Sequence, residues 1–351
     1  MNRRTFLRHG VGGVAGLAAL SGCIGTPGDS GQTLTVAAYS SFTGDGTAGN
    51  WLKSAFESEN PETTVTFQTT ENGVNEFIQR RSQGAPIDAD LFVGLNTGEL
   101  VRADQQLDDS LFTASGDRID GSETVKTALD FDPAGRVVPY DTGYISLVYD
   151  AEEVDEPATF DTLLKPQYEN ELLTQNAEGS DPGRAFLLWT INQKGPDGYL
   201  DYWSQLTDNG IQILSDWGTA YEAYQDEEAS MVVSYSTDQV YYHGDDVDIS
   251  RHQVGFLNDQ GYANPEGMAQ FADADNPELA REFMSFMLSE KAQAEIATRN
   301  VQFPAVEGVD PGGDFGEFAL EPPEAVTYSY DDLVGNVGGW IDEWARQIVS
   351  N

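Results

Sequence analysis

The sequence predicts an α/β protein of two lobes, each a doubly wound, mostly parallel sheet flanked by helices, with a hinge joining the lobes. Two observations lead to this prediction. Short apolar runs typical of strands alternate with amphipathic helical segments along most of the chain. In addition, about 320 residues follow the N-terminal leader, which is more than one hydrophobic core usually holds.

The first third of the chain shows this alternation clearly. Trp51, Leu52 and Phe56 recur at helical spacing, whereas the neighbouring runs are rich in Val, Thr and Phe. We expect strands at 34–39, 64–69 and 89–95, and helices at 50–59 and 73–82. Such a βαβαβ order requires parallel strands, and ligands bind beyond the carboxyl ends of the strands in sheets of this kind.

The centre and the C-terminal third repeat the pattern. We expect extended segments at 137–140, 144–149, 171–175, 211–214, 231–235, 253–257 and 267–271, and helices at 182–193, 199–206, 217–224 and 237–243. Two amphipathic helices are expected within 277–299 and a closing helix at 328–349. Lobe 1 then comprises 33–140 plus 266–351 and lobe 2 comprises 141–265, with chain crossings near 141–144 and 262–267.

The first 23 residues have the pattern of an export signal. Arg3, Arg4 and Arg8 precede an apolar run at 11–20 that is too short for a membrane-spanning helix of about 20 residues. The four residues ending at Cys23 resemble a lipobox, and the arginine pair resembles a twin-arginine signal. The alternative is a chance basic start before a buried helix. Cys23 is the only cysteine, and residues 24–32 are typical of a flexible tether. The pattern predicts a lipoprotein anchored to the outer face of the cell membrane.

The charge of the chain is strongly negative. It has 59 acidic and 18 basic residues, a net charge of −41, and removal of the leader with its three arginines gives 15 − 59 = −44. A nucleic-acid-binding protein needs a cationic face, so this class is excluded. Self-repulsion of this size is tolerable where salt shortens the Debye length, which suggests a salt-loving microbe, a halophilic archaeon. We expect a monomer.

Motifs of enzymes and metal sites are scarce in this sequence. The only histidines are His9 in the leader, His243, which we interpret as a surface or packing residue, and His252. There is no Gly-x-Ser-x-Gly, no phosphate-binding loop and no His-Glu-x-x-His. We therefore expect no catalytic residue, metal or cofactor. An extracytoplasmic hydrolase is the alternative from another class, and common ester and phosphate substrates would test it.

Aromatic and small polar residues gather at predicted strand ends and helix starts, where a binding crevice would form. Helix starts offer free N–H groups to anionic or hydroxyl groups, and aromatic faces attract flat cations. The alternative is that Trp217 and Tyr241 belong to the core and that the polar residues are N-caps. The candidate ligand-binding residues are Tyr39, Asn72, Gly73, Ser180, Asp181, Trp217, Tyr235, Ser236, Thr237, Asp238 and Tyr241.

At these residues the chain resembles the thiamine-binding proteins of ABC importers, a family within the two-lobed periplasmic substrate-binding proteins. The segments that carry the resemblance are 34–42, 90–96, 139–150, 179–183 with 187–189, 217–221, 233–237 and 340–344. The resemblance implies a protein that captures thiamine or its phosphates, closes by hinge motion and delivers the ligand to a membrane permease. It also implies that the family's ligand residues correspond to the candidates above.

Two positions depart from the family pattern. Asn72 stands where the family has an aspartate, and Gly46 stands where bacterial members have a tryptophan, with Trp51 as the candidate replacement. The ligand's chemistry still suits the site, because a thiazolium cation matches aromatic faces and an aminopyrimidine matches polar edges. The second hypothesis is iron, since adjacent Tyr241 and Tyr242 resemble the paired tyrosines of ferric-binding proteins in the same superfamily.

Overall fold

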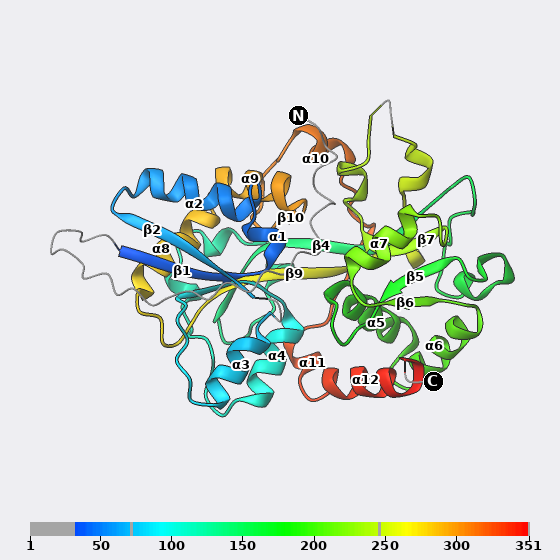
Figure 1. Cartoon of the computed structure of the whole chain (residues 1–351), viewed down its shortest axis with the longest axis horizontal. Helices are drawn as coiled ribbons and strands as arrows, with labels where there is room; N and C mark the ends of the chain where they lie inside the picture. The colour runs from blue at the N-terminus through cyan, green and yellow to red at the C-terminus, as the bar shows by residue number, and fades with distance from the viewer. Residues whose placement is uncertain (1–31, 71–72, 245–246, 350–351) are drawn as a thin grey trace, which may run out of the picture. The chain divides into compact units, whose positions relative to one another are not determined.

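The computed structural model describes residues 32–70, 73–244 and 247–349, and Figure 1 traces its elements along the chain. The predicted leader, Cys23, nearly all of the tether and Asn72 lie outside the described residues. Within the described part of the chain, no helix is long and apolar enough to cross a membrane.

The N-terminal βαβαβ unit is confirmed. Its strands are β1 (Gln32–Ala38), β2 (Thr63–Thr69) and β3 (Leu91–Leu95), and its helices are α1 (Ser40–Thr43), α2 (Ala48–Glu59) and α3 (Asn75–Ser82). Strand β1 pairs in parallel with both β2 and β3. Helix α2 begins where the Thr47 side chain caps the N–H of Asn50, and it buries Leu52 and Phe56 against the sheet. Helix α4 (Thr97–Gln106) follows β3 directly.

Two long antiparallel strands run through the middle of the sheet. They are β4 (Val137–Tyr149) and β9 (Gln260–Gln270), and the strand order is β2-β1-β3-β9-β4-β7-β5-β6. The two extended segments expected at 137–140 and 144–149 are therefore one strand. Short strands β8 (Gln253–Gly255) and β10 (Phe303–Pro304) pair with β4, and β11 (Glu324–Val326) pairs with β9. The sheet is mixed: its flanks are parallel and its centre is antiparallel.

The central part of the chain builds the second parallel flank. It contains β5 (Leu172–Gln175), α5 (Asp181–Lys194), α6 (Tyr199–Asp208), β6 (Gln212–Leu214), α7 (Trp217–Gln225) and β7 (Met231–Tyr235). Strand β5 pairs in parallel with β6 and β7. The helix expected from 237 to 243 is wrong, because only one 3₁₀ turn, Asp238–Val240, forms there.

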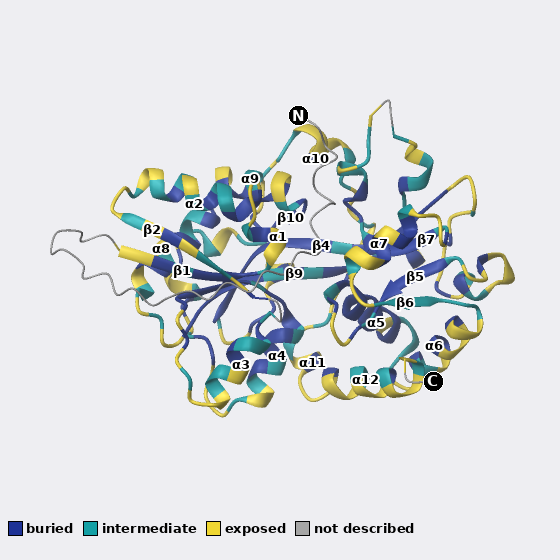
Figure 2. Cartoon of the chain, viewed as in Figure 1, coloured by how far each residue is buried: buried dark blue, intermediate teal, exposed yellow. Residues whose placement is uncertain are grey.

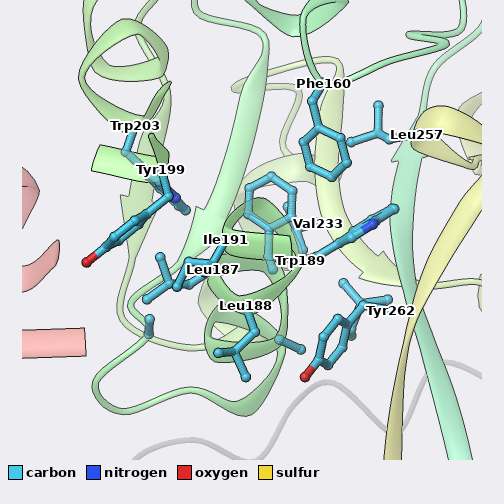
Figure 3. Close-up of a cluster of buried hydrophobic side chains, with 14 of the residues drawn as sticks. Phe160, Leu187, Leu188, Trp189, Ile191, Tyr199, Trp203, Val233, Leu257 and Tyr262 are labelled. Atoms are coloured by element: carbon cyan, nitrogen blue, oxygen red, sulfur yellow. The ribbon is translucent and has the colours of Figure 1, made fainter. Parts of the chain in front are cut away.

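Buried residues, dark blue in Figure 2, concentrate in the strands of the sheet and in the helices beside it, and their side chains form several hydrophobic clusters. The largest surrounds α5, and Figure 3 shows part of it, with Phe160 above Trp189 and with Trp203 near Tyr199. A second cluster joins α2 to α8 (Pro277–Met287) and α9 (Glu290–Asn300), the two helices expected within 277–299.

The C-terminal segment differs from the prediction in two ways. The closing helix is broken into α11 (Tyr330–Leu333) and α12 (Val337–Trp344), with a π turn after α12, because Gly335 adopts a positive φ of 79° between them. Before them, α10 (Gly313–Phe318) is an additional short helix. Trp344 packs on Trp203 of α6 at 5.2 Å between ring centroids. The C-terminal helix thus packs against α6, which we assigned to lobe 2, and the lobe boundaries stay a prediction.

Candidate ligand-binding site

A β-bulge at Tyr140 brings three polar side chains together in the centre of the sheet. Pro139 of β4 lies opposite Gly267 of β9, but the next paired residues are Asp141 and Glu266, so Tyr140 is an extra residue on β4. Consecutive strand residues normally point to opposite faces. Here the Tyr140 hydroxyl donates to Glu266 Oε2 at 2.6 Å while Asp141 is paired with the same glutamate. Tyr140 and Asp141 are both fully buried.

Tyr39 reaches this centre from the carboxyl end of β1. Its hydroxyl donates to Glu266 Oε2 at 2.8 Å, and its ring lies on Gly94, where a Cβ atom would be 2.6 Å from two ring carbons. Gly94 has a φ of +100° at an irregularity in β3, which only glycine adopts easily. Asn300 of α9 completes the group, donating to Asp141 Oδ2 at 2.8 Å and lying 2.9 Å from the Tyr39 hydroxyl.

Tyr235 reaches the same centre from the end of β7. Its ring lies on Gly143 of β4, and its hydroxyl is hydrogen-bonded to the Asn264 side chain. Burial raises the pKa of Tyr235 well above its usual value, and the charges of Glu266, Asp181 and Asp141 raise it further. Two predicted ligand residues, Tyr39 and Tyr235, therefore face one group of carboxylates.

A second polar corner lies where α4 and α5 begin. Asn96 caps α4 by accepting the N–H of Glu99 at 3.0 Å, and the Glu99 carboxylate lies against Gly73, where a Cβ would be 2.7 Å away. Burial and the charge of Asp181 raise the pKa of Glu99 to about 7, although Arg184 and Arg102 act against this rise. Gly73 and Asp181, both predicted ligand residues, are thus brought together around Glu99.

A small cavity lies beside the second polar corner. A cavity of about 20 Å³ is lined by residues of the α4 and α5 starts and of β9, among them Asn96, Arg184 and Asn264. That volume holds about one water molecule. This cavity by itself is too small for a ligand larger than water.

Trp217 lies on the other face of β7. It is the first residue of α7, and its indole Nε1 donates to Ser234 Oγ at 3.0 Å while its ring stacks on Tyr221 at 5.0 Å. Ser234 and Tyr235 are consecutive strand residues, so their side chains point to opposite faces. The structure thus places the partly exposed Trp217 ring near the end of β7 but not against the ring of Tyr235.

The turn after β7 contains three more predicted ligand residues, all of them buried. The Ser236 hydroxyl has no hydrogen-bond partner among the described residues, and Thr237 is 2 % exposed. Both carboxylate oxygens of Asp238 are occupied, Oδ1 by the Tyr221 hydroxyl at 2.6 Å and Oδ2 by His252 Nδ1 at 2.8 Å. Asp238 therefore holds the turn in place.

Two further predicted residues differ sharply in exposure. Ser180 occupies the cap position of α5 and is buried, yet its side chain makes no capping hydrogen bond. Tyr241 is 56 % exposed, whereas the ring of its neighbour Tyr242 stacks on His252 at 4.0 Å. No three His, Cys, Asp or Glu side chains of the described residues form a group that could hold a metal ion.

Comparison with known proteins places this chain in a family. The family model for bacterial extracellular solute-binding proteins matches residues 51–319. This chain belongs to that family. This solute-binding protein is also 28 % identical to the thiamine-binding periplasmic protein of Salmonella typhimurium, over 92 % of this chain and 95 % of the relative.

A solved structure and an iron protein are also similar. The structure of a periplasmic thiamin binding protein matches with a TM-score of 0.78 and 26 % identity, covering 93 % of this chain and 99 % of that one. The iron uptake protein A1 of Synechocystis is 24 % identical over 80 % of this solute-binding protein and 81 % of the relative. These matches bear out the two-lobed periplasmic-binding-protein-like fold.

Sequence reasoning missed the polar residues at the centre of the site. These are Tyr140, Asp141, Glu266, Asn264, Asn300 and Glu99. Asp141 and Glu266 do not stand out among the many acidic residues of the sequence, and only the register of β4 on β9 brings them together. The one available signal was Pro139, because proline in a central strand often marks a bulge.

Proposed function

We propose that this protein captures thiamine outside the cell and delivers it to an ABC importer. The observation that carries the proposal is the convergence of Tyr39 and Tyr235 on the carboxylate group around Glu266. Aromatic rings backed by negative charge suit a flat cation, and thiamine carries a permanent thiazolium charge. The similarity to thiamine-binding proteins over most of the chain supports the same ligand.

The rest of the ligand fits the polar corner beside the tyrosines. An aminopyrimidine needs hydrogen-bonding edges, which Asn96 and Asp181 supply at the cavity and Glu99 supplies beside them. The hydroxyethyl arm, free or phosphorylated, suits the start of α5, where Ser180 leaves its hydroxyl free of capping. Trp217 and Tyr241 would then form the outer part of the wall, with Asn72 and Gly73 as further candidate ligand residues.

We propose that capture uses a hinge, because the cavity of about 20 Å³ beside the polar corner is far too small for thiamine. The paired strands β4 and β9 connect the two parallel flanks of the sheet. We place the hinge where these two strands pass from one flank to the other, near 141–144 and 262–267, so that the flanks open as lobes around the site. The Asp141–Glu266 pair lies within this hinge segment.

Cellular placement follows from the leader. Cys23 would carry the lipid that holds the protein on the outer face of the membrane, and the mature charge of −44 suits a saline exterior. We propose a monomer without enzymatic activity, resident cofactor or metal, whose partners are its ligand, the permease and the membrane.

Iron is the second candidate ligand, favoured by the similarity to the Synechocystis iron uptake protein and by adjacent Tyr241 and Tyr242. The geometry supports it less. The rings of the two tyrosines are 6.5 Å apart and inclined at 62°, and the Tyr242 hydroxyl already accepts a hydrogen bond from Gln225 at 2.7 Å. Among the described residues, no three His, Cys, Asp or Glu side chains lie together as a group that could hold a metal ion near these tyrosines.

Calorimetric titration in molar salt tests the proposal. Thiamine, its mono- and diphosphate and Fe(III) citrate would each be titrated into the protein. We expect at least one thiamine compound to bind in the micromolar range or tighter and iron to give no binding heat. Binding of iron alone, with a tyrosinate charge-transfer band, would replace thiamine by the second candidate.

A further inference from the structure

We propose that Asp141 and Glu266 together recognise the positive charge of the ligand, and that the pair releases one proton when a cationic ligand binds. This inference rests on the proposed function, because it concerns the same site. It adds the residues that select for charge and a measurable proton that accompanies capture.

The first ground is the position of the pair. Asp141 and Glu266 are cross-strand partners on β4 and β9, so their side chains leave the sheet side by side. Asp141 is fully buried, whereas Glu266 is partly exposed and holds the hydroxyl of Tyr39, a candidate ligand residue. The pair therefore lies directly behind the tyrosine that the ligand would contact.

The second ground is the unequal hydrogen bonding of the two acids. Glu266 Oε2 accepts protons from both Tyr39 and Tyr140, at 2.8 and 2.6 Å, which stabilises a carboxylate. Asp141 accepts one hydrogen bond, from Asn300, and its Oδ1 is buried without a partner among the described residues. We therefore place the negative charge on Glu266 and the shared proton on Asp141.

The third ground is the absence of a compensating cation. The groups that face the pair are Tyr39, Tyr140, Asn300, Tyr235 and Asp181. Burial raises the pKa of Asp141 well above its usual value, and the charge of Glu266 raises it further. No described lysine or arginine forms a salt bridge with either acid, so the charge here is left for a ligand to neutralise.

Proton release follows from electrostatics. A thiazolium ring placed against Tyr39 and Tyr235 brings a positive charge close to the pair, which favours the ionised form of Asp141. The carboxyl O–H bond of Asp141 breaks, its electron pair stays on the carboxylate, and the proton passes to solvent. An uncharged ligand provides no such field and leaves the proton on Asp141.

Calorimetry in two buffers measures the proton. Thiamine would be titrated into the wild-type protein at pH 7.5 in molar KCl, once in phosphate and once in Tris, whose ionisation enthalpies differ. Thiochrome, the uncharged oxidised derivative of thiamine, is the neutral probe. We expect the thiamine heat to depend on the buffer, the thiochrome heat to be independent of it, and thiochrome to bind about tenfold or more weakly.

Variants locate the effect. Asp141→Asn should still bind thiamine, with an affinity reduced about tenfold or less, and its binding heat should no longer depend on the buffer. Glu266→Gln should bring the affinities for thiamine and thiochrome close together. The control is Asp90→Asn, because Asp90 is also buried but lies at the other end of β3, bound to the N–H groups of Thr35 and Asn276.

The outcomes separate this inference from the proposed function. If the wild type binds no thiamine compound, the proposed function fails. If it binds thiamine without a buffer-dependent heat, or binds thiochrome as tightly, only the charge-recognition role is wrong. If Asp141→Asn does not fold, the wild-type comparison of thiamine with thiochrome in the two buffers still decides the case.

Discussion

The ring of Tyr235 rests directly on Gly143. A Cβ atom at position 143 would lie 2.6 Å from two carbons of that ring, closer than carbon atoms approach in proteins. The same relationship holds between Tyr39 and Gly94. Tyr39 and Tyr235 thus each lie against a strand at a glycine, which fixes the direction in which the hydroxyl points.

Substitution of Gly143 should therefore weaken ligand binding. Gly143→Ala displaces the Tyr235 ring, and we expect a loss of about 1–2 kcal/mol in thiamine binding, roughly a 5- to 30-fold rise in Kd. Calorimetric titration measures the affinity. Gly338→Ala is the control, because a Cβ at that helical position meets nothing within 4 Å. Equal affinity for thiamine in the two variants would show that Tyr235 is not part of the binding site.

Truncation of Trp217 should reduce affinity more than stability. Its ring is partly exposed at the start of α7, so Trp217→Ala leaves no sealed cavity, and we expect a binding loss of about 1–3 kcal/mol, or 5- to 150-fold in Kd. Trp203→Ala is the control, since Trp203 is fully buried and bonded to Thr190 Oγ1 at 2.8 Å. That change should lower the free energy of unfolding by about 3–5 kcal/mol.

Paired denaturant melts and titrations on both variants separate the two effects. Near-normal thiamine affinity in Trp217→Ala, with a large loss of stability, would show that Trp217 is a core residue. This comparison is informative because Trp217 lies on the face of β7 opposite to that of Tyr235. Its outcome decides whether the ligand extends past the end of β7.

The elements that the sequence predicted well are those with strong local patterns. The strand–helix alternation of residues 32–95 depends on apolar spacing, which a sequence displays directly. The closing helix was predicted as one unbroken helix, because its hydrophobic spacing continues across Gly335, where the backbone breaks it into α11 and α12. The extended segments on either side of Tyr140 were predicted separately, although they form one strand.

The site was only half predictable, for a physical reason. Tyr39 and Tyr235 stand at strand ends, a position that local pattern identifies. Asp141 and Glu266 are separated by more than a hundred residues, and their meeting depends on strand register and on the bulge at Tyr140. In a chain with 59 acidic residues, nothing local distinguishes these two.

Glu99 should make stability depend on pH near neutrality. The pKa of its carboxyl is raised by burial and by Asp181 to about 7 in the folded protein, above the ordinary value of 4.5. Between these pH values the folded state binds more protons than the unfolded state, so stability falls as pH rises through this window. Glu99→Gln should abolish this contribution and raise stability at pH 8 by up to about 3 kcal/mol.

Denaturant melts at pH 5 and pH 8 check this prediction. At pH 5 the variant and the wild type should have similar stabilities, because Glu99 is then protonated in the folded state. Glu295→Gln, on the solvent side of α9 beside Arg299, is the control and should leave the pH dependence unchanged. A wild-type profile that is flat from pH 5 to pH 8 would contradict the role of Glu99.

Removal of the predicted lipid attachment should release the protein from membranes. In Cys23→Ser the sulfur that would carry the lipid is absent, and the remaining leader is too short and too polar at its ends to span a bilayer. We expect the variant in the medium or blocked as an unprocessed precursor. Membrane fractionation with immunoblotting distinguishes these, and tight membrane association equal to the wild type would show that Cys23 is not the anchor.

Salt should stabilise the mature protein, because its 59 acidic and 15 basic residues give a charge of −44. At 1 M salt the Debye length is about 3 Å, and at 0.1 M it is about 10 Å, so dilution restores repulsion among the surface carboxylates and destabilises the compact state. We expect the Tm to fall as KCl is lowered from molar to tenth-molar. NaCl at equal ionic strength should act alike, whereas sucrose at equal osmolality should not replace it. A Tm indifferent to salt would mean that the surface charges are already compensated, and the halophilic interpretation would then be wrong.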